Sequence, residues 1–194
     1  MSRLATVALA IAILLLAAMT SYLVIDDQRR QLPVLQDIGG NFSLPSTDNR
    51  EVQLTDFAGK VVLLNFGFTS CPDVCPTVLS RMRSVMEILN GDSTEIQALF
   101  VTIDPERDVL SKLKTYLSFF HPSFVGLRGD AQQLKTVATL YKAVFEKETI
   151  DSSIDYGFRH SNHIYLIDQE GKTRAMYSGS AKPALIAQEI STLL

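Results

Sequence analysis

The residues best suited to chemistry are two cysteines, Cys71 and Cys75, which lie in the segment CPDVCP at positions 71–76. They follow an apolar, β-rich run at 61–66 and precede a helical repeat of apolar residues that extends to residue 89. The pair is therefore expected where a buried strand ends and a helix begins, with Pro76 as the first helical residue. A tight loop should bring both sulfurs to the helix start, where the positive end of the helix lowers thiol pKa values.

The spacing of the cysteines favours a metal ion as well as a disulfide. Three residues separate Cys71 from Cys75, whereas redox enzymes of the thioredoxin type usually carry two. The wider loop leaves room for an ion between the sulfurs, and two thiolates prefer a soft ion such as Cu(I) or Zn(II). Two ligands are too few for a closed zinc site, so a third must come from elsewhere, and histidine is its natural source.

Three histidines are available as the third ligand. His121 follows a predicted helix and precedes a proline, which indicates a surface or capping role. His160 and His163 share one loop or strand edge. Each can be a ligand or an ordinary residue, and the residues alone leave that choice open.

The elements around these residues predict one α/β domain over residues 39–194. A hairpin at 39–54 is followed by alternating strands and helices, so we expect a mixed sheet with helices on both faces. The expected strands lie at 61–66, 96–103, 124–127, 163–168 and 173–177, and the expected helices at 76–89, 109–120, 131–144 and 182–194.

The N-terminal segment, residues 4–25, carries no charge and is long enough to cross a bilayer as a helix. No good cleavage site follows it, so residues 1–25 are expected to be an uncleaved transmembrane anchor and residues 26–38 a linker. A short cytoplasmic stub would place the domain on the periplasmic side of a bacterial inner membrane, where disulfides persist.

Length and composition exclude several classes of protein. The chain has 194 residues, 46% of them hydrophobic, and a net charge of −3. It is too apolar to be disordered, and two cysteines cannot staple a small disulfide scaffold. The acidic balance argues against nucleic-acid binding through a basic face.

Two blocks together give a specific resemblance. The CPDVCP block and the block VTIDPERD at 101–108, with the segment from Asp155 through His160 to Asp168, resemble the Sco/SenC family of membrane-anchored copper proteins. The resemblance covers about residues 38–193 and implies a thioredoxin-like fold. It also implies that copper, as Cu(I) or Cu(II), is bound by Cys71, Cys75 and His160, because Ser161 follows His160 as in the family pattern. The family commonly has Asp before this histidine, so Arg159 is expected to weaken copper binding or alter partner docking.

The function implied by the resemblance is copper delivery to the copper A centre of cytochrome c oxidase. The partners would be the copper-bearing oxidase subunit or another copper chaperone, and the lipid bilayer through residues 4–25. The alternative is a membrane-tethered thiol-disulfide oxidoreductase, which needs only Cys71 and Cys75. A thiol peroxidase is a third reading, but no arginine is evidently placed to activate a peroxide.

The roles of two acidic features remain open at this point. The segment 104–108, DPERD, is either a capped turn with Asp108 as the helix N-cap or a docking or ligand-supporting loop on the same rim as the cysteines. Asp73, between the cysteines, is expected to be exposed to solvent.

Overall fold

The computed structural model describes residues 9, 11–22, 32–89, 95–149 and 156–194 of the chain. It divides into two units, Met1–Leu32 and Pro33–Leu194. In the first unit residues 11–22 are helical. Across the described residues, no helix combines the length and the apolar character needed to cross a bilayer. The predicted anchor at 4–25 and linker at 26–38 lie partly outside the described residues, and both stay predictions.

The second unit is built on a five-stranded mixed sheet with the order β5-β4-β3-β8-β9. Strands β3, β4 and β5 are parallel to one another, whereas β8 runs antiparallel to both β3 and β9. The parallel strands place the carboxyl ends of β3 and β4 at one edge, where loops can form a site. The bounds are β3 Val61–Gly67, β4 Ile96–Thr102, β5 Val125–Leu127, β8 Ile164–Ile167 and β9 Thr173–Tyr177.

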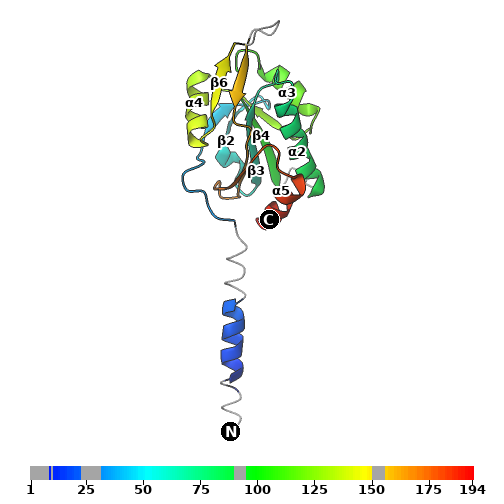
Figure 1. Cartoon of the computed structure of the whole chain (residues 1–194). Coiled ribbons are helices and arrows are strands. Elements are labelled where there is room, and N and C mark those ends of the chain that lie inside the picture. The colour runs from blue at the N-terminus through cyan, green and yellow to red at the C-terminus, as the bar shows by residue number, and fades with distance from the viewer. Residues whose placement is uncertain (1–8, 10, 23–31, 90–94, 150–155) are drawn as a thin grey trace. The chain divides into compact units, whose positions relative to one another are not determined.

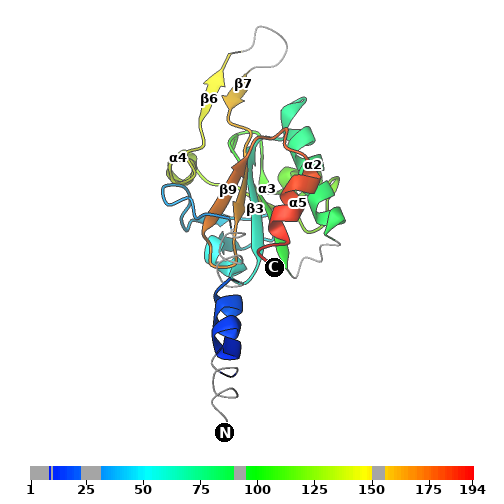
Figure 2. The ribbon, with the colours of Figure 1, turned by 60° about the horizontal axis from the view of Figure 1, so that its bottom comes forward.

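Helices cover both faces of this sheet (Figure 1). Helices α2, α3 and α5 lie on one side and α4 on the other, as Figure 2 also shows. The helix bounds are α2 Val74–Ile88, α3 Leu110–Ser118, α4 Ala131–Leu140 and α5 Pro183–Ile190. The predicted N-terminal hairpin is present as β1 Ser43–Pro45 and β2 Glu51–Gln53, followed by the 3-10 helix η1 Leu54–Phe57. The expected thioredoxin-like α/β fold is thereby confirmed.

The sheet is a rigid base for the loops at its edge. Every residue of β3 and β4 is buried, because helices exclude water from both faces. On the α4 side, the Tyr141 ring packs against Phe66 and Tyr165 with centroid distances of 6.0 and 5.4 Å. The segment that connects β3 to the cysteines therefore begins at a strand end that is held in place by the core.

One pair of strands was missed by the sequence analysis. Strands β6 Phe145–Glu148 and β7 Gly157–His160 pair antiparallel in a separate two-stranded sheet, and Figure 2 shows them extending beyond one end of the main sheet. We call this pair the histidine hairpin. Strand β6 reads FEKE and is mostly exposed, so no apolar alternation marks it.

Several predicted boundaries were also wrong. Helix α4 ends at Leu140 rather than at residue 144, because Lys142 adopts a left-handed conformation with φ of 50°. Helix α5 ends at Ile190, and α3 covers a shorter segment than predicted. Helix α2 begins at Val74, which makes Pro76 its third residue. That position is still in the first turn, where a missing N–H breaks no helical hydrogen bond.

Candidate metal centre

The two cysteines meet at the start of α2, as the sequence predicts. Cys71 lies in the turn after β3, and Cys75 is the second residue of the helix. The backbone N–H of Cys75 donates to the Cys71 sulfur at 3.4 Å. Cys71 is 9% exposed and Cys75 only 1%, and both are free thiols. The sulfur of Cys71 is thus the more accessible one, at the positive end of the helix.

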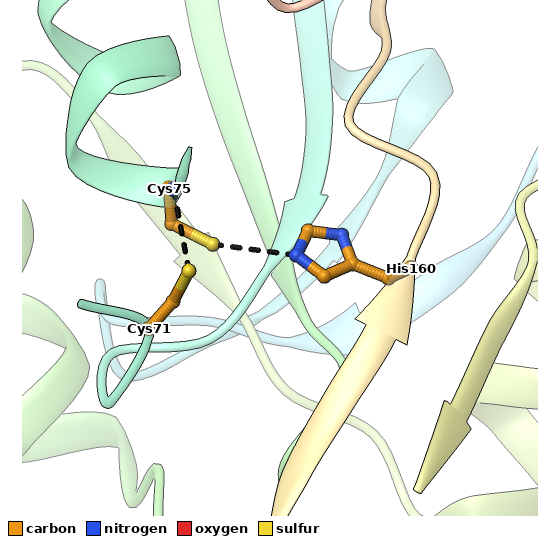
Figure 3. Close-up of side chains that lie close together, drawn as sticks. All are labelled: Cys71, Cys75 and His160. Carbon is orange, nitrogen blue, oxygen red and sulfur yellow. Dashed lines mark hydrogen bonds between the residues drawn. The ribbon is translucent and has the colours of Figure 1, made fainter. Parts of the chain in front are cut away.

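His160 completes the group from the end of the histidine hairpin (Figure 3). Its Nε2 atom lies 3.6 Å from the Cys75 sulfur. Its Nδ1 atom lies 2.9 Å from the carbonyl oxygen of Ser161. Because a carbonyl can only accept, Nδ1 carries a hydrogen, and Nε2 is the ring nitrogen that faces the sulfurs. When Nε2 carries no proton, its lone pair is directed at the sulfurs. This is the tautomer that a metal requires.

These three side chains form a group that can hold one metal ion. The two sulfurs and a ring nitrogen of His160 all lie within 4.8 Å of one another, so a modest adjustment would bring them around a single ion. Among the described residues, no other group of three histidine, cysteine or acidic side chains meets this condition. Two thiolates and one imidazole are a donor set suited to copper and zinc.

The other two histidines lie outside this group. The Nδ1 atom of His121 is 2.7 Å from the Ser123 hydroxyl and also accepts from the Ser123 backbone N–H, so His121 caps a turn after α3, as predicted. The ring of His163 packs against Tyr165 at 6.2 Å. The structure therefore separates the two candidates that the residues left open, in favour of His160.

The environment of the cysteines gives their thiols different acidities. Hydrogen bonds from Cys75 and from His160 lower the pKa of Cys71. The same shared proton, together with deep burial, raises the pKa of Cys75. These opposite shifts favour Cys71 as the thiolate and Cys75 as the thiol when no ion is bound. A bound metal ion would displace the remaining proton.

Asp108 is not a helix cap, and the prediction of that role was wrong. The N-cap residue of α3 is Val109. The fully buried carboxylate of Asp108 instead accepts hydrogen bonds from Thr69, through both its backbone N–H and its hydroxyl, and from the hydroxyl of Thr102. It thereby ties the cysteine loop to the end of β4. Thr69 was missed as a supporting residue, although its place just after a buried strand was a usable signal.

Arg159 points away from the metal centre. Successive side chains of a strand face opposite sides, so Arg159 and His160 project in opposite directions. The Arg159 guanidinium is 71% exposed and pairs with Glu148 at 2.6 Å and with Glu146 at 3.4 Å. Solvent and the two glutamates screen its charge, so we expect its direct effect on bound copper to be small. Asp73 is exposed, as predicted.

The fold and the site together define a class: a thioredoxin-like domain in which a histidine from a separate hairpin joins the cysteine pair. The SCO1/SenC family profile matches residues 30–194. The chain belongs to the SCO1/SenC family, as the resemblance of its motifs predicted.

Individual relatives agree with this assignment. An SCO2-like protein of Rickettsia felis is 43% identical over 136 residues, which cover 70% of this chain and 66% of the relative, slightly less than two thirds of its length. The structure of Bradyrhizobium japonicum ScoI with copper bound is 34% identical, with a TM-score of 0.73 over 81% of this chain and 99% of that one.

A third structure, of BsSco, shares the fold. It is 23% identical, with a TM-score of 0.68 over 84% of this chain and 96% of that one. BsSco is described as a member of the Sco family of cytochrome c oxidase assembly proteins and as having a disulfide switch.

Proposed function

We propose that the protein is a copper metallochaperone that binds copper through Cys71, Cys75 and His160. The observation that carries the proposal is the convergence of the three donor atoms within 4.8 Å. Two sulfurs and one nitrogen suit three-coordinate Cu(I), and an added ligand or water would accommodate Cu(II). The copper-bound structure of the B. japonicum relative supports the choice of metal.

The recipient that we propose is the copper A centre of cytochrome c oxidase, reached directly on its copper-bearing subunit or through another copper chaperone. Membership of a family that includes an oxidase assembly protein supports this target. The position of the site at the sheet edge also supports transfer, because an incoming ligand can displace one donor at a time from an ion at the rim.

Copper transfer is the direct test of this function. The protein loaded with Cu(I) is mixed with the metal-free copper A domain, and the copper content of each is measured after separation. We expect copper on the acceptor with wild type and none with Cys71→Ser, which cannot hold the ion. An acceptor that stays free of copper beside a loaded wild-type donor would contradict the proposal.

A second candidate is supported by the two free thiols. In a thiol-disulfide oxidoreductase, the Cys71 thiolate would attack a partner's disulfide, forming a mixed disulfide and releasing one partner thiolate. Cys75 would then attack Cys71, releasing the second partner thiol and leaving the pair oxidised. This activity does not need His160, so reduction of a disulfide-bonded copper A domain by His160→Ala at the wild-type rate would favour it over copper delivery.

We also propose that residues 4–25 anchor the protein in the inner membrane with the domain on the periplasmic side. The uncharged sequence of that segment supports the anchor. Expression of the full chain in bacteria tests it. We expect the protein in the membrane fraction after carbonate washing, with the domain digested by protease added to spheroplasts.

A further inference from the structure

The histidine hairpin is attached to the domain by side-chain contacts rather than by strand pairing. It forms its own two-stranded sheet rather than extending the main one. A cavity of about 530 Å³ lies between its residues Phe145 and Phe158 and the helix α4. At the base of the hairpin, the Ser161 backbone N–H donates to the Val144 carbonyl at 2.8 Å. Pairing with the main sheet therefore does not fix its position, which depends on side-chain contacts with the domain.

The segment 104–108 supplies these side chains. The single hydrogen of the Tyr156 hydroxyl, next to β7, is shared between Asp104, at an oxygen–oxygen distance of 2.8 Å, and Glu106, at 3.1 Å. On β6 the ammonium of Lys147 lies 3.0 Å from Glu106 and 3.6 Å from the centre of the Tyr156 ring. We call these contacts, with those of Arg107 described next, the clamp.

Arg107 is the central member of the clamp. Its guanidinium pairs with the buried carboxylate of Asp104 and donates to the Tyr156 carbonyl at 3.0 Å. The same planar group lies 3.8 Å from the centre of the Tyr156 ring. A guanidinium can make these contacts together because it is flat and has five donors in a fixed arrangement. Lysine could keep the charge beside Asp104 but could not reproduce this planar arrangement.

Arg107 also reaches the cysteine side of the metal centre. Its guanidinium carbon lies 6.0 Å from the centre of the Phe68 ring, in the loop that leads to Cys71. Phe68 packs against two residues of β7, Phe158 at 5.4 Å and His160 at 5.8 Å. One side chain thus contacts the segments that carry both parts of the metal centre.

We propose that Arg107 is a positioning residue for copper binding, which holds the histidine hairpin so that His160 meets the two cysteines. The inference rests on the proposed function only where copper affinity is measured, because the position of the hairpin can be followed without copper. On this proposal the segment 104–108 supports a ligand, which is one of the roles left open by the sequence.

The test is a double-mutant cycle on Cu(I) affinity, measured in competition with a chelator. Arg107→Lys keeps a cation beside Asp104 and should lower the affinity about tenfold, the usual effect of losing a residue that orients a ligand. In the His160→Ala background the same substitution should change nothing, because the ligand it positions is gone. Equal losses in both backgrounds, or no loss in wild type, would overturn the proposal.

A measurement on the copper-free protein tests the positioning role of Arg107 independently of the proposed copper delivery. In the apo protein, NMR should show contacts between the rings of Phe68 and His160, and Arg107→Lys should weaken them. Unchanged contacts would also overturn the proposal. If wild type binds no copper but the ring contacts weaken, copper delivery fails while the positioning role stands.

Two further variants guard against misfolding and non-specific effects. Tyr156→Phe removes the hydroxyl bonds to Asp104 and Glu106 but leaves the buried carboxylate paired with Arg107, so it should fold and weaken the same ring contacts. Arg83→Lys is the matched control, because Arg83 forms an exposed ion pair with Glu87 on α2. It should leave both affinity and ring contacts at wild-type values.

Discussion

The carboxylate of Asp108 accepts a hydrogen bond from the backbone N–H of Thr69 at 2.9 Å, which joins two segments that are 39 positions apart in the chain. Thr69 precedes the cysteines, and Asp108 precedes α3. The contact is buried at Asp108, so water cannot replace it at low cost. The conformation of the cysteine loop is therefore set partly from the neighbouring strand.

Asp108→Asn should destabilise the protein. The amide keeps the shape of the side chain but carries no charge, so its hydrogen bonds to Thr69 and Thr102 are weaker and the ion pair with Lys112 is lost. We expect the free energy of unfolding to fall by about 1–3 kcal/mol, measured in urea. The exposed Asp48 provides the control. Asp48→Asn should change that free energy by less than about 0.5 kcal/mol, and an equal change in both variants would contradict the role of Asp108.

Gly67→Ala should disturb the metal centre through Cys75. A Cβ atom at Gly67 would lie 2.8 Å from the Cys75 sulfur and 2.8 Å from the Phe100 ring. Both neighbours are buried, so we expect a stability loss of about 1–3 kcal/mol and weaker Cu(I) binding. Adding Phe100→Leu makes space on one side and should recover part of the stability without restoring copper affinity. Wild-type copper binding by Gly67→Ala would show that the sulfur position matters little.

Cys71 should be alkylated before Cys75 across a wide pH range. The lowered pKa of Cys71 means that its thiolate persists as the pH falls below the ordinary cysteine value, whereas the raised pKa of Cys75 keeps it protonated. The greater exposure of Cys71 acts in the same direction. Iodoacetamide labelling of the metal-free protein between pH 6 and pH 8, read by peptide mass spectrometry, checks the order. Faster labelling of Cys75 would contradict the assignment of the lower thiol pKa to Cys71.

Arg159→Ala should leave Cu(I) affinity within about twofold of wild type, since the guanidinium faces solvent and pairs within the hairpin. One of the two expectations from the sequence is that the cation weakens copper binding, and on that view its removal should raise the affinity clearly. Chelator competition distinguishes the two. A tenfold gain for Arg159→Ala would support the electrostatic expectation over the geometry.

The sequence predicts the sheet well because β3 and β4 are mainly apolar, β-rich segments. Such segments are typical of strands that are buried on both faces, as these two are. It places Cys71 and Cys75 correctly because they are close in the chain. The choice of His160 over His163 needed the family resemblance, since spacing alone does not distinguish them.

The histidine hairpin and its clamp could not be predicted in the same way. Strand β6 has no apolar pattern, and it is not joined to β7 by the two-residue turn that marks a hairpin in sequence. The role of Arg107 depends on contacts with Tyr156, which lies 49 positions along the chain. Such contacts are formed by tertiary structure and leave no local periodicity in the sequence.

The most direct test of the account is the Cu(I) affinity and stoichiometry of wild type and His160→Ala, measured side by side by chelator competition. The account predicts one copper ion per wild-type chain and a loss of affinity of tenfold or more in the variant, because one of three ligands is removed. It would be contradicted by a wild-type chain that binds no copper, or by a variant that holds the ion as tightly as wild type.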